Sequence, residues 1–221
     1  ESLDKAHRRN FEWKNTNPFA AFKNLNKFRV VLGLIIGEFL VFLSAKAVET
    51  NWNFYTIYKF GWDDHIVGYS LAFVGVAIAL VQGLLIRVLI PKIGEINAVY
   101  LGMVFEITGL ILFGLATEGW MMFVFLIPYA LGGIGGAALQ GIISNQVPND
   151  QQGELQGTIN GLNSITYIIG PLLMNQLFYY FTSKHAPFIF PGAPFMMGSI
   201  LAAAGLIICF ITLRRSQLKT N

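Results

Sequence analysis

Four ionisable side chains lie within long apolar stretches of the sequence, where charge is unfavourable. Glu38, Lys46 and Glu49 fall in the first such stretch, and Glu106 falls in the third. An ionisable residue at the centre of a bilayer costs about 2.5–3.5 kcal/mol or more, so these positions are candidates for function. A carboxyl group that exchanges between a neutral and a charged form can carry a proton. We therefore expect Glu106 and Glu38 to be candidates for proton coupling.

The charged residues of the first stretch have helical spacing. Lys46 and Glu49 are three residues apart, share a helix face and can form an ion pair. Glu38 precedes Lys46 by eight residues, about two turns, and lies near the same side. This pattern predicts that Lys46 and Glu49 face a substrate pathway together with Glu38. Two simpler interpretations remain: Lys46 and Glu49 only neutralise each other, and Glu106 is a protonated carboxyl bonded to a neighbouring helix.

Uncharged polar residues inside the apolar stretches extend the candidate pathway. Gln82 lies in the second stretch, and Asn160 and Asn163 share a helix face in the fifth. These three amides are expected either to line a binding cavity or to join helices by hydrogen bonds.

Small residues and a proline predict where helices pack and bend. Gly132 and Gly136 form a GxxxG pair, a spacing that lets two membrane helices approach closely. Gly170 and Pro171 predict a kink in the fifth stretch, because proline removes a backbone donor and clashes with the preceding turn. Such a kink serves either gating or static packing.

The composition indicates that lipid surrounds most of the chain. Hydrophobic residues make up 54% and charged residues 12% of the sequence, and its mean hydropathy is +0.56. Soluble domains contain about 25% charged residues. A helix needs about 20 mostly apolar residues to cross the hydrocarbon core. The sequence predicts an all-α, polytopic membrane protein with six transmembrane helices, at 30–52, 66–90, 97–116, 120–144, 157–181 and 194–213.

The distribution of Lys and Arg predicts the orientation of these helices. With an even number of spans both termini lie on one side, and that side holds twelve of the Lys and Arg residues. The opposite side holds only Lys59 and Lys184. Because positive charge accumulates on the cytoplasmic side, both termini are predicted to be cytoplasmic. The chain then divides into a cytoplasmic segment at 1–28, a membrane bundle at 29–213 and a cytoplasmic tail at 214–221.

No residue pattern points to catalysis, to a metal or to nucleic acid. The three histidines lie in polar segments, and one cysteine cannot form an intrachain disulfide. The sequence contains no HExxH motif and no phosphate-binding loop. The net charge of +3 is explained by basic residues beside membrane spans. We therefore predict no enzyme activity, no metal site, no cofactor besides a proton gradient, and no nucleic-acid partner.

Three segments of the sequence carry a family resemblance. They read LGMVFEITGLILFGLATEGWMMF (101–123), YALGGIGGAALQGIIS (129–144) and QVPNDQQGELQGTINGLNSITYIIGPLL (146–173). These segments closely resemble the C-terminal half of the tetracycline efflux pumps of the major facilitator superfamily. The opening segment, ESLDKAHRRNFEWKNTNPFAAF, resembles the end of that family's central cytoplasmic loop.

The resemblance implies a twelve-helix fold of two six-helix halves, with the substrate bound between them. It implies that this chain supplies helices seven to twelve in a bacterial inner membrane, and that its partners are the N-terminal half, protons and a small-molecule drug. In such pumps a magnesium–tetracycline complex leaves in exchange for a proton. Glu106 falls where these pumps carry an essential acidic residue, typically Asp, in the ninth helix. Gln82 matches a polar position of the eighth helix, and Ile78 stands where many of these pumps have a histidine.

We therefore expect the C-terminal half of a proton-coupled drug antiporter that exports tetracycline-like or other small amphipathic compounds. Because its first residue is Glu1 rather than Met, the chain is expected to be a fragment or truncated product, inactive without the N-terminal half. The alternatives are a metabolite or sugar exporter of the same fold, and a non-transporting remnant.

The predicted orientation can be tested with reporter fusions. Green fluorescent protein fused after Asn221 is expected to fluoresce, because that terminus is predicted to be cytoplasmic. Alkaline phosphatase fused at the same site is expected to be inactive. As a control, alkaline phosphatase inserted after Lys184 is expected to be active, because that residue is predicted to lie on the opposite side. Active phosphatase after Asn221 would contradict the predicted orientation.

Overall fold

The computed structural model of the chain describes residues 29–220, and the side chains of residues 30–215. All regular elements in this range are helical, which confirms the predicted fold class. In chain order they are α2 (Arg29–Phe60), α3 (Asp64–Leu80), η3 (Val81–Leu85), α4 (Ile86–Ile93), α5 (Glu95–Leu115), α6 (Gly119–Asn145), η4 (Asn149–Gln151), α7 (Gln152–Thr182) and α8 (Ala193–Thr220). The predicted segment at 1–28 lies outside the described residues.

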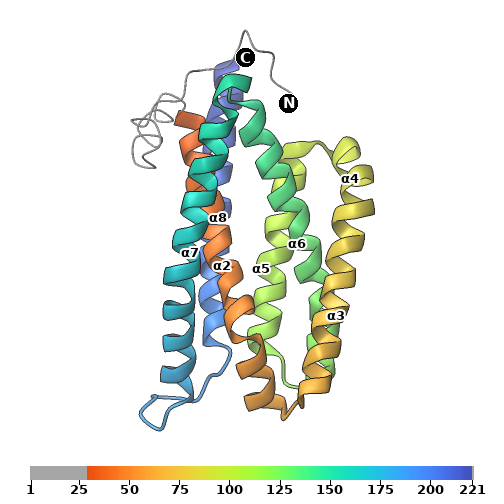
Figure 1. Cartoon of the computed structure of the whole chain (residues 1–221), viewed down its shortest axis with the longest axis vertical. Coiled ribbons are helices and arrows are strands. Elements are labelled where there is room, and N and C mark those ends of the chain that lie inside the picture. The colour runs from red at the N-terminus through yellow and green to blue at the C-terminus, as the bar shows by residue number, and fades with distance from the viewer. Residues whose placement is uncertain (1–28, 221) are drawn as a thin grey trace.

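The described residues form six long helices. These helices stand side by side and run alternately up and down (Figure 1). One of them consists of α3, η3 and α4 joined end to end, from Asp64 to Ile93. Five of the six are long and apolar enough to cross a membrane: α2, α3 to α4, α5, α6 and α8. The remaining helix, α7, contains the predicted span at 157–181 and has 31 residues. It is not among the five.

Glycine and a capping carboxylate set the helix ends near the membrane surfaces. Gly61 has φ +65° and Gly94 has φ +82°, a region that favours glycine, and both stand at boundaries between helices. The N-cap of α3 is Asp63, whose Oδ1 accepts a hydrogen bond of 2.8 Å from the Ile66 amide. These residues lie where the chain reverses direction, between α2 and α3 and between α4 and α5 (Figure 1).

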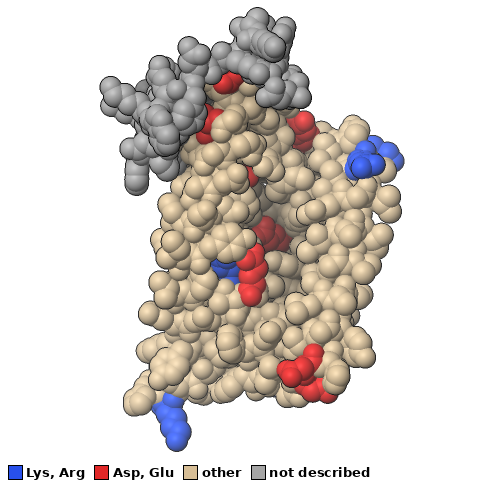
Figure 2. All heavy atoms as spheres, in the orientation of Figure 1, with Lys and Arg blue, Asp and Glu red and all other residues tan. Residues whose placement is uncertain are grey.

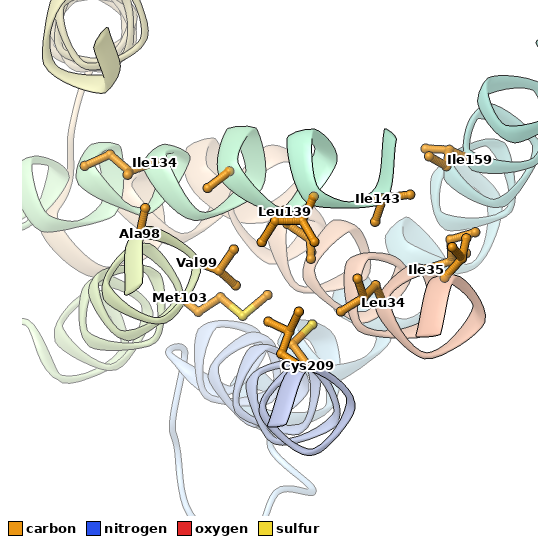
Figure 3. Close-up of a cluster of buried hydrophobic side chains, with 14 of the residues drawn as sticks. Leu34, Ile35, Ala98, Val99, Met103, Ile134, Leu139, Ile143, Ile159 and Cys209 are labelled. Carbon is orange, nitrogen blue, oxygen red and sulfur yellow. The ribbon is translucent and has the colours of Figure 1, made fainter. Parts of the chain in front are cut away.

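Buried side chains from all six long helices hold the bundle together. Figure 3 shows Met103 of α5, Leu139 of α6 and Cys209 of α8 meeting at the centre of one buried cluster, beside Leu34 and Ile35 of α2. In lipid, helix association depends on close packing rather than on removal of apolar surface from water. Interdigitated side chains of this kind are therefore the main source of cohesion.

The closest contact between two helices joins α5 and α6 through glycine. A Cβ added at Gly102 would overlap the backbone of Gly135, and a Cβ added at Gly132 would lie 2.8 Å from Cβ of Glu106. Gly132 therefore packs as the GxxxG pattern predicted. Gly136 does not, because a Cβ there would meet nothing within 4 Å. The two α6 glycines that contact α5 are Gly132 and Gly135, and a packing role for Gly136 stays a prediction.

The Gly170–Pro171 dipeptide lies inside α7, which is one helix from Gln152 to Thr182. Gly170 has a packing role: a Cβ there would lie 2.6 Å from Cβ of Lys46 on α2. The small residue thus admits the stem of a lysine from the neighbouring helix. The predicted kink at Pro171 stays a prediction.

The α5–α6 contact generates a stability prediction. Substituting Gly102→Ala is expected to lower the free energy of unfolding by about 1–3 kcal/mol, because the added methyl group overlaps backbone that cannot move independently. Thermal unfolding of the purified chain in detergent measures the effect. The control Gly136→Ala is expected to leave stability unchanged or slightly raised, because the methyl group enters open space. Equal effects of the two variants would contradict the assigned contact.

Candidate functional site

A cavity opens between four helices of the bundle. They are α2, α5, α6 and the continuous helix that consists of α3, η3 and α4. Its volume is about 610 Å³, which is within the range of small-molecule sites. Figure 2 shows this face of the molecule hollowed near its middle, with acidic atoms inside the hollow. The polar residues that line the cavity come from four helices and converge on it: Glu38, Gln82, Glu106, Tyr129 and Gln140.

Glu38 reaches the cavity from α2. The residue is 4% exposed, and its Oε2 atom is buried without a hydrogen-bond partner in the part of the chain that the structure describes. A buried carboxylate oxygen with no donor is costly, so native structures rarely leave one without a purpose. The sequence predicted Glu38 as a candidate from its depth in the span, but could not show that its carboxyl group is unpartnered.

Glu106 reaches the same cavity from α5, and it is buried with 8% exposure. Its Oε1 atom lies 2.7 Å from Oγ of Ser44, which comes from α2. The same Ser44 hydroxyl lies 2.7 Å from the carbonyl oxygen of Val41. The carboxyl group of Glu106 thus bonds to a neighbouring helix, as the simpler interpretation of the sequence allowed, and it also faces the cavity.

The hydroxyl of Ser44 can serve both charge states of Glu106. A serine hydroxyl has one hydrogen to donate and two lone pairs to accept with. When Glu106 is ionised, Ser44 donates that hydrogen to the carboxylate. When Glu106 is neutral, the carboxyl hydrogen can be donated to Oγ while Ser44 donates to Val41. The pair is therefore hydrogen-bonded before and after a proton arrives.

Gln82 lines the cavity from η3, a π-helical segment of five residues between α3 and α4. Short π-helical insertions in α-helices occur frequently at functional sites. The sequence predicted Gln82 as a pathway residue but not the π-helical turn. It also missed Gln140 and Tyr129, which occupy the α6 wall of the cavity. Both residues lie on the span that contains the Gly132–Gly136 pair, and this position could have marked them as candidates.

Lys46 and Glu49 form the predicted ion pair, with Lys46 Nζ 2.6 Å from Glu49 Oε2. Lys46 also lies over the ring of Tyr167 on α7, 3.5 Å from its centroid, a distance suited to a cation–π contact. Neither member of the pair lines the cavity. The charged stripe predicted on one helix is therefore divided: Glu38 faces the cavity, whereas Lys46 is held by Glu49 and α7.

Asn160 and Asn163 lie on α7, which contributes no residue to the cavity wall. Asn163 accepts a hydrogen bond of 3.2 Å from Thr166 of its own helix through its side-chain oxygen. Asn160 is exposed on the outside of the described bundle. The structure thus does not bring these two amides together with Gln82, because α7 packs on α2 away from α3. Their role in a substrate pathway stays a prediction.

The helices and the cavity together define a multi-pass membrane protein with a polar site inside its bundle. A sequence profile of the Major Facilitator Superfamily matches residues 34–221, so the chain belongs to that family. This is a family of membrane transporters of small molecules rather than of enzymes, and the six helices are those of half its fold. The resemblance seen in the sequence is confirmed at this level.

Individual relatives support the same assignment. The chain is 32% identical to the class C tetracycline resistance protein of Escherichia coli over 211 residues, 96% of this chain and 51% of that protein. It is 38% identical to the class E protein of Escherichia coli over 146 residues, 66% of this chain and 36% of that protein. It is 27% identical to Hippocampus abundant transcript-like protein 1 of Homo sapiens over 210 residues, 89% of this chain and 42% of that protein. The chain spans about half the length of the curated relatives it matches.

The contact between Ser44 and Glu106 predicts a measurable loss of stability. Substituting Ser44→Ala is expected to lower the free energy of unfolding by about 1–3 kcal/mol, because the buried Glu106 carboxyl group loses its partner. Unfolding in detergent by heat or by added denaturant measures the change.

A matched control for this substitution is Ser199→Ala on α8. Ser199 is also buried and donates a 2.7 Å hydrogen bond to a carbonyl of its own helix, that of Met196, but its hydroxyl reaches no acidic group among the described contacts. Its replacement is expected to cost clearly less. A larger loss at Ser199 than at Ser44 would show that the interhelical bond contributes little.

Proposed function

We propose that this chain is the C-terminal half of a proton-coupled antiporter that exports small amphipathic compounds, tetracycline-like drugs among them. The observation that carries the proposal is the buried Glu106 carboxyl group at a cavity wall, hydrogen-bonded to Ser44. The similarity to tetracycline resistance proteins over 96% of the chain supports the drug class. In this proposal the complete protein lies in a bacterial inner membrane with both termini of this half in the cytoplasm.

The proposed chemistry is the exchange of one proton at Glu106 for one bound substrate. An ionised carboxylate in an apolar bundle is unfavourable, so protonation or binding of a positively charged group relieves the same cost. Ser44 donates a hydrogen bond to the ionised form and accepts one from the neutral form. Glu38, which shares the cavity, is the second candidate for the exchanging group.

The cavity is also the reason to propose that this half does not transport by itself. Transporters of this architecture bind substrate between two repeats and rock one against the other. The hollow lies on one face of the described bundle (Figure 2), and the chain covers about half of its relatives' length. We therefore propose an N-terminal six-helix half as the partner that closes it.

A metabolite or sugar exporter is the second candidate. The human relative, whose name refers to no drug, is 27% identical over 89% of this chain. The same helical scaffold therefore occurs in proteins that are not named for tetracycline resistance, and the substrate is decided by the cavity rather than by the fold. Export of a tetracycline-like drug as its magnesium complex belongs to the proposal of a drug antiporter.

Transport measurements test the proposal. The completed protein, with the N-terminal half encoded in frame before Glu1, is expected to confer drug resistance and to exchange protons for drug in inverted vesicles. Glu106→Gln is expected to abolish the exchange, because glutamine cannot take up or release a proton. Glu118→Gln is the matched control, an exposed acid of the same bundle that lies outside the cavity, and is expected to retain it.

The chain alone, inserted in vesicles, is expected to show no proton-driven uptake. Uptake by the chain alone would overturn the half-transporter proposal. Unchanged resistance and proton exchange in Glu106→Gln would overturn the coupling role of that carboxyl group.

A further inference from the structure

A second, smaller cavity lies between α7 and α8, apart from the polar cavity described above. Its volume is about 380 Å³, near the lower end of the range of small-molecule sites. The last turns of α7, the first turns of α8 and the segment that joins them form its wall. None of the described residues in this wall has a polar side chain, and none of them lines the polar cavity. A ligand of the α7–α8 cavity therefore makes only apolar contacts inside it.

The shape of this cavity is fixed by contacts within the chain. The Phe190 amide donates a hydrogen bond of 2.9 Å to the carbonyl oxygen of Phe181, and the Ala193 amide donates one of 3.1 Å to that of Phe190. The ring centroids of Phe181 and Phe188 are 5.5 Å apart, and those of Phe188 and Phe190 are 6.4 Å apart. These are usual separations for aromatic pairs. The joining segment is thus fastened to the end of α7, with its aromatic rings along the cavity.

The α8 side of the wall is suited to a flexible hydrocarbon. Met196 and Met197 lie there, and methionine side chains adapt to irregular apolar shapes. Ile200 lines the cavity and is 62% exposed, so it stands at the opening toward the surroundings of the bundle. Sites for drug-like molecules contain a few polar groups that orient the ligand. A wall without such groups favours an alkyl chain instead.

A basic residue follows the α7 end of this cavity in the chain. Lys184 lies in the segment between α7 and α8, is exposed, and has no acidic partner among the described residues. This segment is at the end of the bundle opposite to the start of α2 (Figure 1). Lys184 is one of only two Lys or Arg residues that the sequence predicts on this side, where positive charge is uncommon. A lysine at a membrane boundary extends its ammonium group to the lipid headgroups.

The cavity and the lysine together define the chemistry of the ligand. The cavity accepts an apolar chain, and the ammonium group attracts an anion at the membrane surface. A free phosphate ion has no chain to place in the cavity, and a polar organic molecule finds no hydrogen-bond partner in its wall. A phospholipid has both parts, and the surrounding bilayer supplies it.

We propose that the chain retains one phospholipid of net negative charge, with an acyl chain in the α7–α8 cavity and its phosphate group at Lys184. This inference goes beyond the proposed function and does not rest on it, because it concerns a different cavity at a different place in the bundle. The lipid fills space between α7 and α8 that no described side chain fills.

Native mass spectrometry of the purified 221-residue chain in detergent tests the proposal. The probes are phosphatidylglycerol, which is anionic, and phosphatidylcholine, which is zwitterionic, both with the same acyl chains. One molecule of phosphatidylglycerol is expected to be retained per chain, with a preference of about fivefold over phosphatidylcholine, because one lysine near a membrane surface contributes about that factor. Phosphatidylglycerol with a photoreactive diazirine on one acyl chain is expected to label residues 177–200.

A matched pair of substitutions tests the place of the acyl chain. Ile200→Trp narrows the opening of the cavity from an exposed position, so the fold is preserved and retention of both lipids is expected to be lost. Ile207→Trp is the control on the same helix: Ile207 is 58% exposed and lies outside the cavity. It is expected to retain the lipid as the parent chain does. Equal retention by the two variants would refute the assignment of the cavity.

A second pair tests the place of the headgroup. Lys184→Gln is expected to reduce the preference for phosphatidylglycerol to about onefold, while one lipid is still retained through its acyl chain. Lys92→Gln, an exposed lysine at the opposite end of the bundle, is expected to leave the preference unchanged. An unchanged preference in Lys184→Gln would show that the phosphate group does not lie at this lysine.

Other results would overturn the proposal as a whole. They are the absence of a retained lipid, photolabelling confined to other helices, or a dimer of the chain that Ile200→Trp dissociates, which would assign the cavity to a second copy. None of these results bears on proton exchange by the completed protein, which is measured separately. Failure of that exchange would likewise leave the lipid site standing.

Discussion

The architecture depends on the close approach of the α5 and α6 backbones. Gly102 and Gly135 leave no room for a side chain between them, and Gly132 allows α6 to lie against Glu106 itself. α6 thus contacts the backbone and Cβ of Glu106, while the carboxyl group of that residue lies 2.7 Å from Oγ of Ser44 on α2. The acid and its partner are therefore positioned by residues that have no polar side chain at all.

The second organising feature is the way α2 distributes its charges. Over about three turns it carries Glu38, Ser44, Lys46 and Glu49, each with a different surrounding. Lys46 is held by Glu49 and by the aromatic ring of Tyr167, with its stem in the notch at Gly170. Because this cation is engaged on the α7 side, it cannot neutralise the acids on the cavity side. The cavity is thus acidic in part because Lys46, which lies outside it, is paired with Glu49 and Tyr167.

Much of the fold could be predicted from the sequence, because apolar length and composition decide which segments cross a bilayer. The all-helical class, the positions of the helices and the pairing of Lys46 with Glu49 all follow from local spacing. What local spacing could not supply is the side of a helix that a neighbouring helix covers. Gly136 fits the GxxxG spacing but faces open space, and Asn160 and Asn163 are polar residues within a span but lie away from the cavity.

The cavity itself could be predicted only in part. Glu38, Glu106 and Gln82 were identified because each is polar inside an apolar stretch, and all three line one cavity. Gln140 and Tyr129, both on α6, were missed although Gln140 is polar inside an apolar stretch just as Gln82 is. The unpartnered oxygen of Glu38 is a tertiary property, since it depends on which donors the other helices bring near it, and no spacing in the sequence reports it.

The π-helical turn η3 has a consequence for the wall opposite α2. In an α-helix of 3.6 residues per turn, positions four apart overshoot a full turn, so a row of them drifts around the axis. A turn closed by i→i+5 bonds is wider, so positions four apart fall short of a full turn and the drift reverses. Ile78, Gln82 and Ile86 are spaced by four and straddle η3, and all three face the same hollow. One wide turn thereby straightens a spiral row of side chains into a strip parallel to the helix axis.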